Sequence, residues 1–123
     1  MLINLSNHAQ KFWSEKQKRA ARQYGNIVDV PFPAVDPHAD LAAIRKLAQE
    51  YAQRCRQILA AATDAKHAIH IMGEMTFVYQ FIRQMHREVL CLAATGVRDV
   101  KDEFPDGGKI SYFQFVQFRP YEI

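Results

Sequence analysis

The run Val89-Leu90-Cys91-Leu92-Ala93-Ala94 decides the fold class of this chain. It is too short for a helix with these flanks, and it lacks the alternation expected of a strand with one solvated face. An uninterrupted apolar run of this length is typical of a strand that is buried on both sides in a parallel sheet. The segment therefore predicts an α/β protein with helices on both faces of its sheet.

Three further apolar runs precede this segment, and each has the length of a strand. They lie at residues 2–5, 27–30 and 68–72. Pro31 and Pro33 prevent the second run from continuing as a central strand, because proline has no N–H to donate to a neighbouring strand. We expect all four runs to belong to one sheet.

Helical patterns separate the four runs. In the first, Ser14 and Gln17 have the spacing of a capping box. The second and strongest pattern follows Asp36 and Pro37, which suit the N-cap and the first helical position, and it extends to about Ala62. The third helix carries an apolar face made of Phe77, Val78, Phe81, Ile82 and Met85.

The C-terminal part predicts a β-hairpin. Pro105-Asp106-Gly107-Gly108 is a turn sequence between two extended arms, 98–104 and 110–119. The complete order is βαβαβαβ followed by this hairpin, which implies right-handed crossovers and a parallel sheet. The predicted fold is therefore α/β: a single Rossmann-like domain over residues 1–123, with a mostly parallel sheet flanked by helices and a C-terminal β-hairpin.

The positive charge of the chain is concentrated near its N-terminus. Its 123 residues contain 16 Lys and Arg against 13 Asp and Glu, a formal net charge of +3. Up to Arg22, Glu15 is the only acidic residue, and the basic residues there are Lys11, Lys16, Lys18, Arg19 and Arg22. A basic patch confined to this segment suits a small phosphate-bearing ligand. In the rest of the chain acidic and basic residues nearly balance, which argues against duplex DNA as a partner.

Composition also predicts where the protein resides. The chain is 49% apolar and 24% charged, as in ordinary globular domains, and no apolar run approaches the roughly 18 residues of a membrane-spanning helix. Met1-Leu2-Ile3-Asn4 lacks the basic region of a signal peptide. Cys55 and Cys91 lie within apolar patterns, so we expect reduced thiols, a cytoplasmic location and no membrane partner.

Three polar segments follow predicted strands. They are Ser6-Asn7-His8, Gly73-Glu74-Met75-Thr76 and Thr95-Gly96-Val97-Arg98. In open α/β sheets, ligands bind beyond the carboxyl ends of the strands, near the point where the strand order reverses. Gly73 allows close backbone approach, the helix that follows favours an anion at its start, and the Arg98 guanidinium suits a phosphate. The sequence therefore predicts a ligand site at this edge, next to the basic first helix.

Each of these residues also has a purely structural interpretation, which the sequence leaves open. Ser6 and Asn7 can simply end a strand, and Gly73 can serve a tight turn. Either Glu74 or Thr76 can cap the helix. The other structural assignments are Arg98 paired with Asp99 or Asp102, His70 as a core histidine, and Trp13 as a packing residue.

Several known site types are absent from the sequence. No G-x-G-x-x-G follows the first strand, and there is no Walker A, G-x-S-x-G or H-E-x-x-H motif. His67 and His70 would point to opposite faces of a strand, so they make a poor metal pair. We therefore expect no metal and no cofactor.

The polar segments resemble those of the CRISPR-associated Rossmann-fold (CARF) family, in particular its small standalone members found beside type III CRISPR systems. The resemblance rests on 4–8, 72–77 and 93–98, and on a closing hairpin at 108–119. It implies a homodimer that binds a cyclic oligoadenylate messenger of antiviral defence across its axis. It also implies that a chain without an effector domain acts as a metal-independent ring nuclease or passes the signal to a partner.

Within the ring-nuclease chemistry that the resemblance implies, position at the predicted ligand edge suggests roles for particular residues. Ser6 and Arg98 would hold the scissile phosphate, with His8 or Lys11 as proton donor or added charge, so Ser6, His8 and Arg98 are the candidate catalytic residues. The other candidate ligand contacts are Asn7, Lys11, Gly73, Glu74, Met75, Thr76, Thr95 and Gly96.

Two alternatives remain at this point. One is a non-catalytic module that docks on a partner protein or RNA through the basic segment 11–22 and the aromatic hairpin. Incomplete burial of Tyr112, Phe113, Phe115 and Phe118 would indicate such an interface. The other is a hydrolase or transferase that acts on a different nucleotide in the same site.

Overall fold

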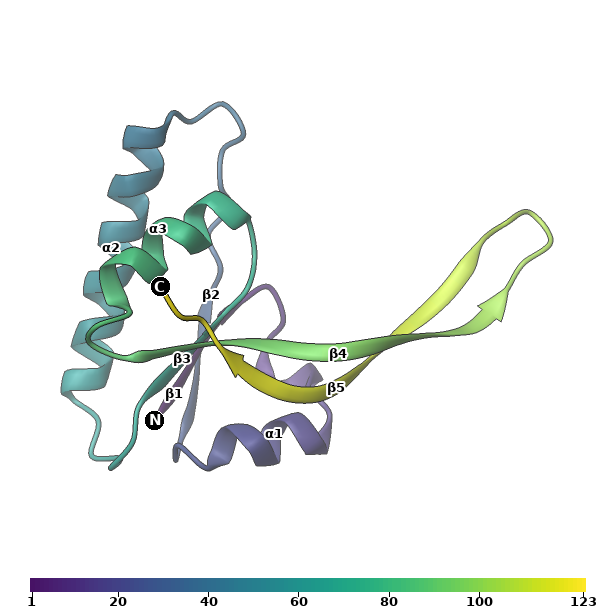
Figure 1. The fold of residues 1–123 in the computed structure, drawn as a ribbon, viewed down its shortest axis with the longest axis horizontal. Helices are drawn as coiled ribbons and strands as arrows, with labels where there is room; N and C mark the ends of the chain where they lie inside the picture. Colours follow the sequence, from purple (N-terminus) through teal and green to yellow (C-terminus); the bar gives the residue numbers. More distant parts are fainter.

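Five strands form one sheet in the order β2-β1-β3-β4-β5 (Figure 1). The computed structural model describes the backbone of residues 1–123 and the side chains outside 99–103 and 109–111. Along the chain the elements are β1 (Leu2–Ser6), the 3-10 turn η1 (Gln10–Phe12), α1 (Glu15–Arg22), β2 (Ile27–Pro31), α2 (Leu41–Ala60), β3 (Ala68–Ile71), α3 (Met75–Met85), β4 (Leu90–Glu103) and β5 (Lys109–Pro120).

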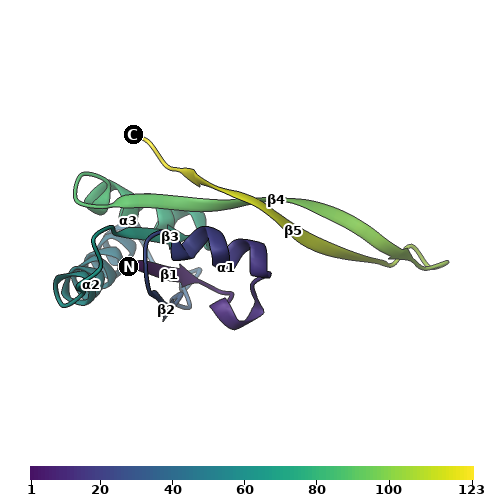
Figure 2. The same ribbon diagram turned by 90° about the horizontal axis from the view of Figure 1, so that it is seen from below.

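The topology confirms the predicted fold class. β1 pairs in parallel with β2 and β3, β3 pairs in parallel with β4, and β4 and β5 are antiparallel. The chain moves from β1 to β2 in one direction and from β3 to β4 in the other, so the strand order reverses between β1 and β3. Figures 1 and 2 show α1 on one face of the sheet, with α2 and α3 on the opposite face.

The apolar core is divided by the sheet. On the α2–α3 side it contains Phe77 and Phe81, both fully buried, and truncation of a buried phenylalanine to alanine typically costs about 3–5 kcal/mol. On the α1 side it contains Trp13 and Leu92. Cys91 lies in the first cluster and Leu92 in the second, so this strand is buried on both faces as predicted.

The first helix starts where the sequence predicts. The Ser14 hydroxyl accepts the N–H of Gln17 at 3.2 Å. The chain leaves the helix through Gly25, whose φ of +102° is a conformation that favours glycine. The sequence pattern therefore placed α1 correctly.

The second helix starts later than predicted. The Asp36 carboxylate accepts the N–H of His38 at 2.8 Å, and the Asp36 carbonyl accepts that of Ala39, which closes a turn before the helix. Asp40 is the actual N-cap, and its side chain accepts the N–H of Ala43 at 2.9 Å. The assignment of Asp36 and Pro37 to the helix start was wrong because a second aspartate four residues later caps the helix instead.

The predicted loop at Thr95-Gly96-Val97-Arg98 was also wrong, because β4 continues through it. Cross-strand pairing with β5 runs from Leu92–Pro120 to Glu103–Lys109, with irregularities between Thr95 and Gly96 and between Val100 and Asp102. The Thr95 hydroxyl donates to the Gln117 carbonyl at 3.1 Å. The two strands form a ribbon that projects from the rest of the molecule (Figures 1 and 2).

The ribbon ends in the predicted turn. The N–H of Phe104 donates to the Gly108 carbonyl at 2.7 Å, and the N–H of Gly107 donates to the Phe104 carbonyl. Gly107 has a φ of +88°. Glycine therefore meets the backbone requirement of this turn.

Both cysteines are free and buried, as predicted. Burial raises the pKa of Cys55 to about 12 and that of Cys91 to about 11, so both remain thiols at neutral pH. Among the helices that the structure describes, none combines the length and hydropathy required to cross a bilayer.

Candidate functional site

A cavity lies at the carboxyl edge of β1 and β2. Its volume is about 190 Å³, and its lining includes Asn4, Ser6, Asn7, Asp29 and Phe32. Ser6 and Asn7 are among the residues predicted from the sequence. The sequence analysis did not single out Asp29 or the Asn4 side chain, although Asn4 and Ser6 interrupt one face of an otherwise apolar strand.

The cavity stands beside a row of polar residues that crosses three strands. Asn4 of β1 is in register with Asp29 of β2 and with His70 of β3. The Asn4 amide nitrogen donates to Asp29 Oδ1 and to the His8 carbonyl, each at 2.8 Å. Its amide oxygen lies 2.7 Å from the Ser6 hydroxyl and 2.9 Å from His70 Nδ1. All the polar atoms of the buried Asn4 side chain therefore have partners.

This arrangement determines the protonation of His70. Asn4 Oδ1 can only accept, so Nδ1 of His70 carries the proton. Nε2 is buried and has no hydrogen-bond partner among the groups that the structure describes. Desolvation lowers the pKa of His70 to about 4, with a further contribution from the nearby His8, so the ring is neutral at pH 7.

Aromatic side chains enclose His70 on the α1 side of the sheet. The Trp13 ring meets it edge to face, with centroids 5.4 Å apart, and the Phe118 ring centroid lies 5.5 Å away. Trp13 is 8% exposed, which confirms the interpretation as a packing residue. His70 is a core histidine, but only its Nδ1 is satisfied.

Ser6 holds the loop that follows β1. Its side chain is buried, and its hydroxyl donates to Asn4 Oδ1 and accepts the N–H of His8 at 3.3 Å. Asn7 and His8 are exposed above it. The hydroxyl therefore fixes the loop, while the side chains available to a ligand are those of Asn7 and His8.

Glu74 occupies the start of α3. Its carboxylate accepts the N–H groups of Thr76 at 3.0 Å and Phe77 at 2.8 Å, and the Thr76 hydroxyl donates to it as well. The hydrogen bond from the Thr76 hydroxyl, followed by that from the Phe77 N–H, lowers the pKa of Glu74. Of the two capping alternatives, Glu74 is therefore the cap, and the positive end of this helix already faces a carboxylate.

Phe32 contacts this turn and also lines the cavity. A Cβ on Gly73 would lie 2.3–2.6 Å from atoms of the Phe32 ring, so the ring packs directly on the glycine backbone. Phe32 also belongs to the lining of the cavity. Met75 is 83% exposed at the first residue of α3. Phe32 thus contacts Gly73 and lines the cavity together with Ser6 and Asn7.

The remaining predicted residues lie on other elements. Lys11 is exposed in η1, with its Nζ 5.0 Å from the centre of the Phe12 ring. Arg98 is exposed on the ribbon, in register with Phe113. A Cβ on Gly96 would meet the Phe113 ring and the Gln114 carbonyl, so Gly96 accommodates an aromatic side chain in this structure.

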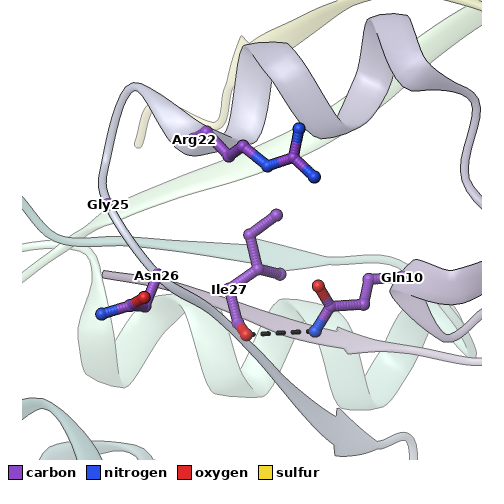
Figure 3. Close-up of a pocket in the computed structure, with 5 residues that line it drawn as sticks. All are labelled: Gln10, Arg22, Gly25, Asn26 and Ile27. Carbon is purple, nitrogen blue, oxygen red and sulfur yellow. Dashed lines mark hydrogen bonds between the residues drawn. The ribbon is translucent and has the colours of Figure 1, made fainter.

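A second, larger pocket lies between α1 and β2 (Figure 3). Its volume is about 460 Å³, and it is lined by Gln10, Arg22, Gly25, Asn26 and Ile27. Gln10 Nε2 donates to the Ile27 carbonyl at 3.0 Å, and the N–H of Gln10 donates to Asp29 Oδ1. Gln10 therefore connects this pocket to the polar row, a role that the sequence did not suggest.

Within the part of the chain whose side chains are described, no three His, Cys, Asp or Glu residues gather closely enough to hold a metal ion.

The model of the Uncharacterized protein MJ1673 family matches residues 1–119. No curated protein and no solved structure matches the chain.

Proposed function

The chain belongs to the Uncharacterized protein MJ1673 family, and we propose that it is a cytoplasmic, homodimeric ring nuclease that binds a cyclic oligoadenylate and opens it without a metal. The observation that carries this proposal is the polar cavity at the carboxyl edge of the sheet. It lies at the carboxyl ends of β1 and β2, the edge at which open α/β sheets bind ligands, beside the reversal of strand order between β1 and β3.

The lining of the cavity suits the edge of an adenine base. Adenine presents an amino donor beside ring-nitrogen acceptors. Asp29 offers carboxylate oxygens to the amino group, and the exposed amide of Asn7 can donate to a ring nitrogen. A carboxylate at this place favours a base over a phosphate. We therefore assign the cavity to a base and the phosphates to the basic surface outside it.

The size of the cavity supports a dimer. About 190 Å³ is less than the roughly 300–1,000 Å³ of pockets that enclose a drug-sized ligand. One copy therefore accommodates a single base, while a cyclic ligand presents several. Two copies related by a twofold axis would offer two equivalent cavities to such a ring.

The chemistry requires positioning and charge. The ribose 2′-oxygen attacks the adjacent phosphorus in line, and the bond from phosphorus to the 5′-oxygen breaks. The products are a 2′,3′-cyclic phosphate and a 5′-hydroxyl. The 2′-hydroxyl loses its proton, and the leaving 5′-oxygen takes one up. We assign this proton transfer to His8. Lys11 and Arg98 stabilise the charge on the phosphate oxygens, and Ser6 acts as a positioning residue through the loop.

The direct test is incubation of the purified protein with cyclic tetra- and hexa-adenylate in the presence of EDTA. Chromatography should show linear products that end in 2′,3′-cyclic phosphate. Replacement of Asn7 by alanine should weaken binding, and replacement of His8 should slow cleavage. His38→Ala, in an exposed turn outside the cavity lining, is the matched control. Absence of both binding and cleavage would contradict the proposal.

A second candidate is a non-catalytic module that binds a partner protein. It is favoured by the hairpin, where Tyr112 is 48% and Phe113 47% exposed although Phe115 is buried. Contiguous exposed apolar surface is typical of interaction sites. RNA binding would instead show a steep loss of affinity with salt and no preference for cyclic ligands.

A further inference from the structure

The pocket between α1 and β2 is large enough for part of a small ligand, and the proposed base site does not use it. Its volume of about 460 Å³ falls within the roughly 300–1,000 Å³ of pockets that enclose small molecules. Figure 3 shows three of its lining side chains around one space: Arg22 from α1, Gln10 from η1 and Ile27 from β2. The Asn26 side chain points away from them. The pocket therefore has a cationic, an amide and an apolar wall.

Arg22 is the cationic group of this pocket. It is exposed at the last residue of α1, and it forms no ion pair with the acidic side chains that the structure describes. Lys18, by contrast, lies 3.5 Å from Glu15. Asp29 lines the cavity but does not line this pocket. A guanidinium without a carboxylate partner offers paired N–H donors in the geometry that a phosphate accepts.

One carboxylate, that of Asp64, contacts the lining from the side of Gly25. It accepts the N–H of Asn26 at 2.9 Å and lies 3.4 Å from the Asn26 amide nitrogen. A Cβ on Gly25 would meet the same carboxylate, so Asp64 packs against the backbone at this point. Asp64 therefore orders the rim of the pocket and is itself satisfied by hydrogen bonds.

Gln10 places a hydrogen-bond acceptor in the pocket. Its Nε2 donates to the Ile27 carbonyl at 3.0 Å and lies 3.4 Å from Asp29 Oδ2, so the amide hydrogens are directed at β2. The amide oxygen is turned away from these contacts, toward the side of Arg22 (Figure 3). An amide oxygen accepts hydrogen bonds and cannot donate them. The pocket thus combines donors for an anion with an acceptor for a hydroxyl, which are the groups that a ribose phosphate requires.

The pocket and the cavity adjoin along β2. Ile27 and Asp29 are two residues apart, so their side chains lie on the same face of the strand, about 6.6 Å from each other along it. This spacing is comparable with the length of one nucleoside. Gln10 stands at the boundary, because it contacts Ile27 of the pocket and Asp29 of the cavity. A nucleotide with its base in the cavity can therefore extend its phosphate toward Arg22.

We propose that this pocket binds the ribose and phosphate of the nucleotide whose base occupies the cavity. Arg22 binds the phosphate, the Gln10 amide oxygen accepts a ribose hydroxyl, and the Ile27 side chain packs against the sugar. The inference rests on the proposed function, from which it takes the assignment of the cavity to adenine. It adds the residue of the basic surface that holds one of the phosphates.

Titration of the full-length protein with adenosine and with its 3′- and 5′-monophosphates measures what the phosphate contributes. At least one monophosphate should bind roughly tenfold or more tightly than adenosine, as expected for a charge-assisted hydrogen bond. In nuclear magnetic resonance spectra of the isotope-labelled protein, the side-chain amide signal of Gln10 should shift with that monophosphate. Equal affinity for adenosine and both monophosphates would overturn the proposal, and so would an unshifted Gln10 signal.

Replacement of Arg22 tests the assignment of the phosphate. Arg22→Ala should reduce the affinity for the monophosphate to that for adenosine and leave the affinity for adenosine unchanged. Arg22→Lys keeps the charge but loses the paired donors, so its affinity should be intermediate. Arg87→Ala removes the same charge from an exposed position before β4 and is the matched control. A preference for the monophosphate that survives in Arg22→Ala would overturn the proposal.

Two further measurements check the interpretation of these variants. Arg22 also lies at the negative end of α1, so circular dichroism should confirm that each variant is folded. Inorganic phosphate alone should shift the Gln10 signal less than the monophosphate at the same concentration. An equal response to inorganic phosphate would mean that the base contributes nothing, and it would overturn the connection with the cavity.

The outcomes separate this inference from the proposed function. Cleavage of cyclic tetra- or hexa-adenylate with the same KM in Arg22→Ala and in the parent chain would overturn the inference and support the ring nuclease. Binding of a monophosphate that depends on Arg22, in a protein that neither binds nor cleaves the cyclic ligands, would support the pocket and contradict the ring nuclease.

Discussion

Asn4 Oδ1 and His70 Nδ1 lie 2.9 Å apart between two central strands, and this contact places the proton of the neutral histidine on Nδ1, while Nε2 is buried. The orientation of the Asn4 amide follows from its nitrogen, which donates to two acceptors, Asp29 and the His8 carbonyl. The stability of the sheet centre therefore depends on His70 remaining neutral.

Stability should fall on acidification because of His70. Its pKa is about 4 in the folded chain and about 6.5 when unfolded, so the unfolded state binds the proton first as the pH falls. This contribution is complete above pH 6.5 and is lost between pH 6.5 and 4, by about 3 kcal/mol. Urea unfolding at a series of pH values measures it. His70→Asn keeps a donor near Asn4 but cannot titrate, so its stability should lack this pH dependence; an unchanged profile would contradict the assignment.

Replacement of Asn4 by aspartate should be strongly destabilising at neutral pH. The new carboxylate would face Asp29 and the His8 carbonyl at about the 2.8 Å of the present donor contacts. Burying an uncompensated charge there should cost roughly 3 kcal/mol or more. Asp29→Asn is the control, because it can still accept from Asn4 and Gln10. The double variant Asn4→Asp/Asp29→Asn should recover part of the loss in chemical unfolding, and full additivity would argue against direct coupling.

Removal of the Glu74 carboxylate should distinguish the role of Glu74 as a helix cap from a role in ligand binding. Glu74→Ala removes the acceptor for the N–H groups of Thr76 and Phe77, and loss of an N-cap costs about 1 kcal/mol. The vacated helix start should then bind inorganic phosphate more tightly than the parent chain, as measured by calorimetry. Weaker binding of phosphate or of cyclic ligand in this variant would indicate that Glu74 itself contacts the ligand. Glu122→Ala, exposed after β5, is a suitable control.

Gly73 and Phe32 should be energetically coupled. Gly73→Ala places a methyl group 2.3–2.6 Å from ring atoms of Phe32, which forces the ring to move and should cost about 1–3 kcal/mol. Phe32→Ala removes the obstacle, though it also loses the contact with Phe77. A double-mutant cycle in urea should therefore give less destabilisation than the sum of the two single changes. Strict additivity would contradict the close packing.

Local patterns identified most of the fold. The run at 89–94 contains Cys91 and Leu92, which enter the cores on opposite faces of the sheet, and Ser14 caps α1 as its spacing predicts. These features depend on neighbouring residues alone. The start of α2 was wrong because Asp36 and Asp40 are both good caps, and hydrogen bonding within the intervening turn decides between them.

The path of β4 shows where local patterns fail. Thr95 and Gly96 suggested a loop, yet pairing with Gln117 and Phe115, about twenty residues away in sequence, keeps the chain extended. The aromatic ring of Phe113 occupies the space that Gly96 leaves. Gly96 therefore does not interrupt the strand, and it accommodates a cross-strand neighbour.

By itself, the sequence determined the kinds and order of the elements, the hairpin turn, and the position of Ser6 and Asn7 at the carboxyl edge, because periodicity and turn chemistry act over a few residues. Only the tertiary structure decided that Asp29, Asn4 and His70 form one row, that Asn4 sets the tautomer of His70, and that Gln10 reaches Asp29. The row depends on the register of three strands distant in sequence, and that register is set by burial of whole strand faces.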